Sequence, residues 1–76
     1  MSFDYSKLRG RIVEKFGTLG AFALGMGWSE RTNGLKINGS VEWKQGEIVK
    51  AGELLDIDPS EYEVYFFKPK VQNVEQ

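Results

Sequence analysis

The sequence predicts an all-α fold, a compact domain of four to five short helices that contains a helix-turn-helix. The segment 18–39, TLGAFALGMGWSERTNGLKING, has the pattern of two short helices joined by a tight turn. On both sides of it, apolar residues recur at helical spacing. The chain has 76 residues, which is enough for one domain, and 41% of them are hydrophobic, which favours folding over disorder.

The first helix is predicted over residues 5–16, with Asp4 as its N-cap. An apolar stripe at four-residue spacing should face the core; it consists of Leu8, Ile12 and Phe16. A second stripe at the same spacing is basic and consists of Lys7, Arg11 and Lys15. Two interpretations stay open for the basic stripe, a solvated face or a set of phosphate contacts.

The second helix is predicted over residues 19–26, with Thr18 as its cap. Ala23 places a small side chain where a following helix would cross, and Gly27 four residues later can adopt positive φ in the turn. Trp28 is then expected to be a buried hydrophobe of the turn. This spacing predicts the first half of a helix-turn-helix unit.

The third helix is predicted over residues 30–37, capped by Ser29 and ended by Asn38 and Gly39. It is the candidate recognition helix. An extended link at residues 41–43 follows, with Trp43 expected in the core.

The fourth helix is predicted from residue 44 or 45 to residue 55. The aromatic run 62–67 is either a short helix or a strand, and Pro69 ends it. Residues 60–76 are a candidate dimerisation segment followed by a loose tail. The whole chain is expected to form a single domain.

Composition narrows the possible functions. The chain has no cysteine and no histidine, which disfavours an enzyme and gives no reason to expect a metal or another cofactor. It shows neither a signal-peptide core nor a membrane-length apolar run, so a cytoplasmic location in a bacterial host is expected. The net charge of −1 divides into +3 over residues 1–50 and −4 over residues 51–76. The first half is therefore the better candidate for contact with DNA.

Several segments resemble small phage-encoded regulators of the Cro/CI superfamily, the lambda-repressor-like DNA-binding domains. These segments are KLRGRIVEKFGT, SERT, KINGSVEW and EIVKAGELLDI, and the resemblance covers about residues 3–72. It implies a Cro-like repressor that binds double-stranded operator DNA as a homodimer, with the third helix in the major groove.

The resemblance implies that Glu30, Arg31 and Gly34 face outward early in the third helix, with Ser29 near a phosphate at its cap and Asn38 at its end. By residue type, Arg31 would read guanine, Lys36 would neutralise a phosphate, and Asn33 would read adenine if it faced outward. The full set of predicted DNA-binding residues is Ser29, Glu30, Arg31, Asn33, Gly34, Lys36, Asn38, Ser40 and Lys44.

Two positions depart from the superfamily pattern. Leu19 stands where a glutamine usually braces a phosphate, and Asn33 stands where an aliphatic residue usually enters the core. Asn33 therefore either buries its amide, or the third helix is rotated or frayed.

These departures and the near-neutral charge favour an alternative, an antirepressor or modulator that binds a repressor protein through the same scaffold. In that case Arg31→Ala would leave activity unchanged, whereas substitutions at Leu19 or Tyr65 would abolish it.

Overall fold

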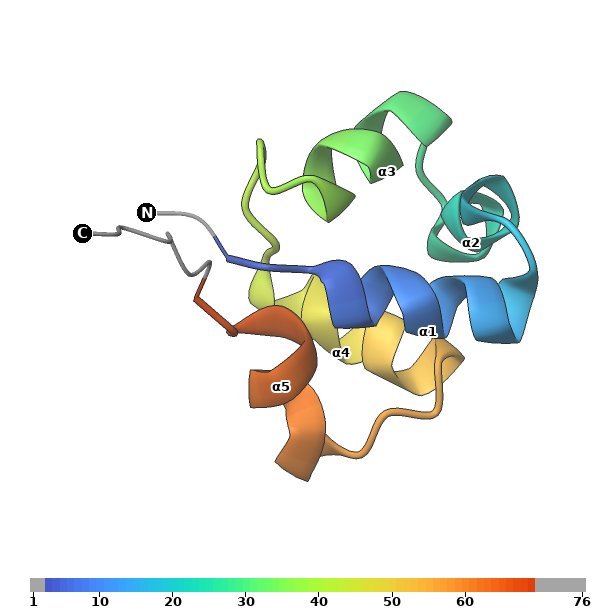
Figure 1. Ribbon diagram of the computed structural model, residues 1–76. Helices are drawn as coiled ribbons and strands as arrows, with labels where there is room; N and C mark the ends of the chain where they lie inside the picture. Colours follow the sequence, from blue (N-terminus) through green and yellow to red (C-terminus); the bar gives the residue numbers. More distant parts are fainter. Residues whose placement is uncertain (1–2, 70–76) are drawn as a thin grey trace.

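The computed structural model describes residues 3–69, and within this range the chain is helical (Figure 1). The elements are α1 (Ser6–Phe16), α2 (Leu19–Met26), α3 (Glu30–Ile37), α4 (Gln45–Leu54), the 3-10 turn η1 (Pro59–Glu61) and α5 (Tyr62–Phe66). The predicted all-α fold is confirmed, and the aromatic run 62–67 forms a helix rather than a strand. The predicted loose tail and the end of the candidate dimerisation segment, residues 70–76, lie outside the described residues.

A short polar side chain begins α2 at the predicted place, and another lies just before α1. Thr18 Oγ1 accepts a hydrogen bond from the Ala21 amide at 3.1 Å, so it caps α2 as expected. The Asp4 carboxylate accepts from the Ser6 amide at 2.9 Å and from the Ser6 hydroxyl at 2.6 Å. Because α1 begins at Ser6 instead of residue 5, Asp4 lies one residue before the N-cap position and still satisfies an amide of the first turn.

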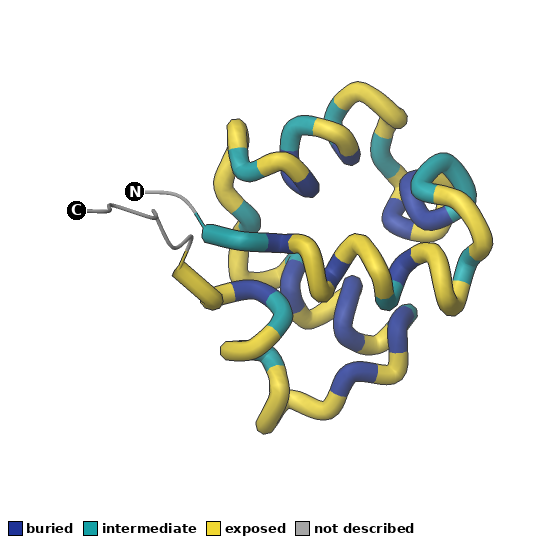
Figure 2. Tube along the Cα trace, in the orientation of Figure 1, coloured by how far each residue is buried: buried dark blue, intermediate teal, exposed yellow. Residues whose placement is uncertain are grey.

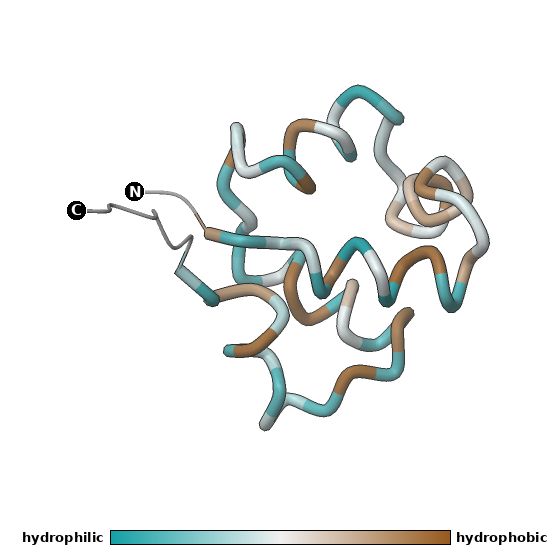
Figure 3. Tube along the Cα trace, in the orientation of Figure 1, coloured by the Kyte–Doolittle hydropathy of each residue, from teal (hydrophilic) through white to brown (hydrophobic). Residues whose placement is uncertain are grey.

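The core forms where α1, α2, α4 and α5 meet, and Figure 2 shows the buried positions of these helices turned toward one another. Hydropathy follows the same pattern on α1, α4 and α5, whereas α2 carries no hydrophilic colour in Figure 3. The largest fully buried side chains are Phe22, Phe66, Leu8, Ile12, Leu55 and Asn33. Trp28 and Trp43 pack against this core as predicted.

The basic stripe of α1 makes contacts with the C-terminal half of the chain. Arg11 Nε donates to the Leu55 carbonyl at 2.9 Å and Nη2 to the Asp56 carbonyl at 3.3 Å, which satisfies groups at the end of α4. Lys15 pairs with the Asp56 carboxylate at 2.8 Å. The Lys7 ammonium lies 5.3 Å from the centre of the Tyr65 ring. The interpretation as a solvated face therefore holds for Lys7 and Lys15, which are exposed while they contact the C-terminal half of the chain, and phosphate contact by the stripe stays a prediction.

The two ends of the described chain lie side by side (Figure 1). Phe3 and Pro69 form an isolated antiparallel bridge, and the Asp4 amide donates to the Lys68 carbonyl at 2.7 Å. The segment before α1 is thereby fixed against the end of α5. Over residues 3–69, no helix is long and apolar enough to cross a membrane.

Candidate interaction surface on α2 and α3

The α2–turn–α3 unit has the backbone geometry that the sequence predicts. Gly27 has φ of 82°, a left-handed conformation that favours glycine, and the Trp28 amide donates to the Ala23 carbonyl at 3.1 Å. Ser29 Oγ accepts from the Thr32 amide at 3.0 Å and begins α3. The unit therefore has the element order and capping of a helix-turn-helix.

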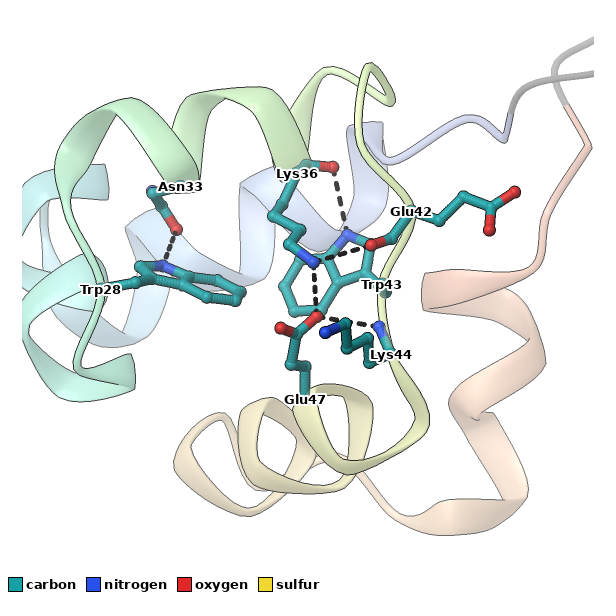
Figure 4. A network of polar contacts seen from close by, with 7 residues as sticks. All are labelled: Trp28, Asn33, Lys36, Glu42, Trp43, Lys44 and Glu47. Atoms are coloured by element: carbon teal, nitrogen blue, oxygen red, sulfur yellow. Dashed lines mark hydrogen bonds and ion pairs between the residues drawn. The ribbon is translucent and has the colours of Figure 1, made fainter.

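Asn33 faces the interior, so the prediction that it reads adenine is wrong. Its side chain lies on the inner face of α3, and the residue is only 2% exposed. Asn33 Oδ1 accepts from Trp28 Nε1 at 3.0 Å (Figure 4). Asn33 Nδ2 donates to the Leu19 carbonyl at 3.2 Å. Both ends of the amide are occupied, and they tie α3 to the turn and to the start of α2.

Lys36 is also buried, so the prediction that it binds a phosphate is wrong as well. The residue is 4% exposed, and its Nζ donates to the Glu42 carbonyl at 2.7 Å and to Glu47 Oε1 at 2.6 Å (Figure 4). The ammonium also lies 5.5 Å from the centre of the Trp28 ring. The charge of Lys36 thus joins α3 to α4 and is not available to DNA.

Glu47, in the first turn of α4, pairs with the Lys36 ammonium. Its Oε1 also accepts from the Lys44 amide at 2.8 Å, which caps the helix. Burial raises the pKa of Glu47, but the hydrogen bonds from Lys36 and from the Lys44 backbone outweigh it and hold the pKa below the ordinary glutamate value. Glu47 is therefore a structural carboxylate, a role that the sequence analysis did not assign.

The other seven predicted DNA-binding residues are exposed: Ser29, Glu30, Arg31, Gly34, Asn38, Ser40 and Lys44. The side chains of Ser29 and Asn38 already accept backbone amides, from Thr32 and Ser40. Arg31 and Lys44 remain as the exposed cations of the segment 18–44, in which Glu30 and Glu42 are exposed anions. The exposed charges of this segment are therefore balanced, and Lys50 on α4 adds one exposed cation at the end of α2, where its Nζ donates to the Met26 carbonyl at 3.2 Å.

A carboxylate also stands at the beginning of α2. A Cβ atom placed on Gly20 would lie 3.0 Å from Glu30 Oε2, so the Glu30 side chain covers the first turn of α2. A helix N-terminus attracts anions, and here a carboxylate of the same chain is already close to it. The position at which a helix-turn-helix domain holds a phosphate therefore carries a negative charge.

Leu24 is the surface feature that the sequence analysis missed. It is 83% exposed, the most exposed of the large hydrophobic side chains in the described part of the chain. The helix that carries it, LGAFALGM, contains no charged or hydrogen-bonding side chain. The signal was present in the sequence, because Phe22, Ala23 and Met26 form the inner face and leave Leu24 on the other side.

Comparison with known proteins finds one matching family and a similar solved structure. A family model described as "Protein of unknown function (DUF739)" matches residues 1–69. No curated protein sequence matches the chain. A solved structure, the modulator of repression (MOR) of the temperate bacteriophage TP901-1 from Lactococcus lactis, is 51% identical, with a TM-score of 0.79. The match covers 95% of this chain and 97% of that one.

These similarities support a phage regulatory protein with an all-helical fold. Membership of the Cro/CI superfamily, operator binding and a homodimer stay predictions. On the strength of the match over residues 1–69, the chain belongs to the family of proteins of unknown function DUF739.

Proposed function

We propose that this protein is a non-catalytic modulator of repression that acts by binding a repressor protein through the outer face of α2. The observation that carries the proposal is Leu24, which projects from an uncharged helix and is 83% exposed. Burying a leucine side chain at an interface contributes roughly 1.5–3 kcal/mol, so such a residue favours contact with protein over contact with phosphate.

The charge distribution supports the same interpretation. DNA affinity depends on lysine and arginine side chains that displace counterions from phosphates. Asn33 and Lys36 are buried, and the exposed cations Arg31 and Lys44 are balanced by Glu30 and Glu42. A protein partner makes no comparable demand for positive charge.

The similarity to a phage modulator of repression, at 51% identity over nearly the full length of the chain, also supports the proposal. It favours the alternative of a repressor-binding modulator over that of a Cro-like repressor. The modulator would use the helix-turn-helix scaffold without reading DNA.

The test is a binding titration with a repressor from the same phage or prophage, using wild type, Leu24→Ala and the matched control Val64→Ala. Val64 lies on α5 and is also an exposed hydrophobic residue, at 45%. We expect Leu24→Ala to weaken repressor binding by about tenfold or more, and Val64→Ala to leave it unchanged. Circular dichroism should show that both variants remain folded, because neither side chain is in the core.

A parallel titration against operator and scrambled DNA at two salt concentrations separates the two functions. Selective, salt-sensitive DNA binding that is lost in Arg31→Ala would reject the modulator and restore the Cro-like repressor. Repressor binding that does not depend on Leu24 would reject the α2 surface.

A further inference from the structure

A hollow of about 210 Å³ lies beside the paired ends of the described chain, and it is made by other elements than α2. Its lining comes from the segment before α1, from the link between α3 and α4, from α4 and from the end of α5. The lining residues are Phe3, Tyr5, Glu42, Trp43, Ile48, Phe66 and Phe67. Sites that hold a whole small molecule measure roughly 300–1,000 Å³, so this hollow is suited to a single side chain.

Its walls are mainly aromatic, and the rings support one another. Phe3 and Phe67 meet edge to face with 6.1 Å between their centres, and Trp43 and Phe66 do so at 5.2 Å. Phe67 is 45% exposed, although it lies at the end of a helix that closes the core. An aromatic surface that stays accessible to solvent can accept the methylene stem and the charge of a cationic side chain.

Glu42 adds a carboxylate to this aromatic lining. Its backbone is fixed, because its carbonyl accepts the Lys36 ammonium at 2.7 Å. Its carboxylate extends away from Lys36, as Figure 4 shows. Among residues 3–69, no lysine or arginine lies close enough to pair with this carboxylate. Burial, and secondarily the charge of Glu42, raises the pKa of the Tyr5 hydroxyl, which agrees with a carboxylate near the lining tyrosine.

We propose that this hollow receives an arginine or lysine side chain presented by a partner polypeptide. The rings of Trp43 and Phe67 would cover the stem and face of the cation, and the Glu42 carboxylate would pair with its charge. Charge complementarity selects this occupant, because an anionic side chain would be repelled by Glu42 and an apolar one would gain no attraction from its carboxylate.

The test uses the full chain labelled with ¹⁵N and two blocked tripeptides, one with a central arginine and one with a central norleucine. The Trp43 indole N–H, which donates to the Lys36 carbonyl at 3.1 Å, is the reporter. We expect the arginine peptide to shift this signal and the Glu42 amide, with an affinity about threefold to fivefold higher than that of the norleucine peptide.

Glu42→Gln should remove the preference for the arginine peptide. The free variant should still give the NMR spectrum of a folded protein. Glu53→Gln is the matched control, because Glu53 is an exposed carboxylate on α4 that does not line the hollow. Phe67→Ala should weaken binding of both peptides, since it removes one wall.

Equal binding of the two peptides, or a preference that survives in Glu42→Gln, would overturn the proposal in favour of an apolar site. The absence of shifts with either peptide would also overturn it. Neither peptide assay involves a repressor or Leu24. A negative result with the peptides therefore does not affect the proposed function, and a negative repressor titration does not affect the proposal of a cation site.

Discussion

A buried amide destabilises a fold unless both of its polar ends find partners. Asn33 meets this condition with the Trp28 indole and the Leu19 carbonyl, which lie 5 and 14 residues earlier in the chain. The same side chain that makes the third helix look unsuited to a core therefore fixes its position. The Asn33 side chain is buried because it makes these two contacts.

Asn33→Ala should lower the free energy of unfolding by about 2–3 kcal/mol. It leaves the Trp28 indole N–H without an acceptor and opens a small cavity. Urea denaturation measures the change, and Gln45→Ala at the exposed start of α4 serves as the control. A loss below about 0.5 kcal/mol, the range of ordinary surface substitutions, would contradict the structural role of the amide.

Glu47 makes stability depend on pH in a defined direction. Because its pKa is lower when folded than when unfolded, its contribution is present above about pH 4.5, the ordinary glutamate value, and is lost as pH falls through the folded pKa. Glu47→Gln should therefore be less stable than wild type at neutral pH, and the difference should shrink in acid. Thermal melts between about pH 7 and pH 3 test this. A stability difference that stays constant across this range would contradict it.

At the scale of the helix, two glycines that lower helix propensity equally differ in the space around them. A Cβ atom added to Gly10 on α1 would meet nothing within 4 Å, whereas one added to Gly52 on α4 would lie 2.7 Å from the Tyr62 ring. The close approach of α4 to Tyr62 requires a residue without a side chain. Glycine in a helix thus marks a packing contact at one position and only a local weakness at the other.

Gly10→Ala should raise the free energy of unfolding by about 0.5–1 kcal/mol, through helix propensity. Gly52→Ala should lower it by about 1–3 kcal/mol, because Tyr62 must move away from α4. Chemical denaturation of the two variants in parallel measures both signs. Stabilisation by both substitutions would show that the Tyr62 ring shifts at little cost.

The elements themselves were largely predictable, because local signals define them. Thr18, Ser29 and Gly27 act through neighbours within four residues, and the ranges of α2 and α3 agree with the prediction. The inner face of α3 was not predictable. Its sequence has few apolar residues, so the choice of face depends on partners elsewhere in the chain, such as Glu47 for Lys36.

The candidate site was predictable only in part for the same reason. Glu30, Arg31 and Gly34 are exposed at the start of α3, as the resemblance to Cro-like domains implies. Asn33 and Lys36 were assigned to DNA by residue type, and their residue type says nothing about partners 11 or 14 residues away. Leu24 was overlooked because an apolar residue in a short helix is ordinarily assigned to the core.

At the scale of the whole molecule, α1 is held to the end of α4 by contacts that span more than 40 residues of chain. Arg11 donates to the Leu55 carbonyl at 2.9 Å with its side chain 25% exposed, whereas the Lys15–Asp56 pair has an Asp56 side chain that is 71% exposed. The first contact is shielded from solvent and the second is screened by it.

Arg11→Ala should therefore lower the free energy of unfolding by about 1.5–2 kcal/mol, since hydrogen bonds from a charged donor are lost. Lys15→Ala should lower it by less than about 0.5 kcal/mol. Denaturation at low and high salt distinguishes the two contributions, and only the smaller one should vary noticeably with salt. Equal losses from the two substitutions would contradict this ranking.

The two tryptophans give the molecule an internal optical reporter. Trp28, from the turn before α3, and Trp43, from the link after it, lie edge to face with 5.4 Å between their ring centres. Indoles at this separation couple their electronic transitions and produce a paired circular dichroism band that disappears when they move apart. Because the two rings bracket α3, that band would register the docking of this helix separately from the helical content of the rest of the chain.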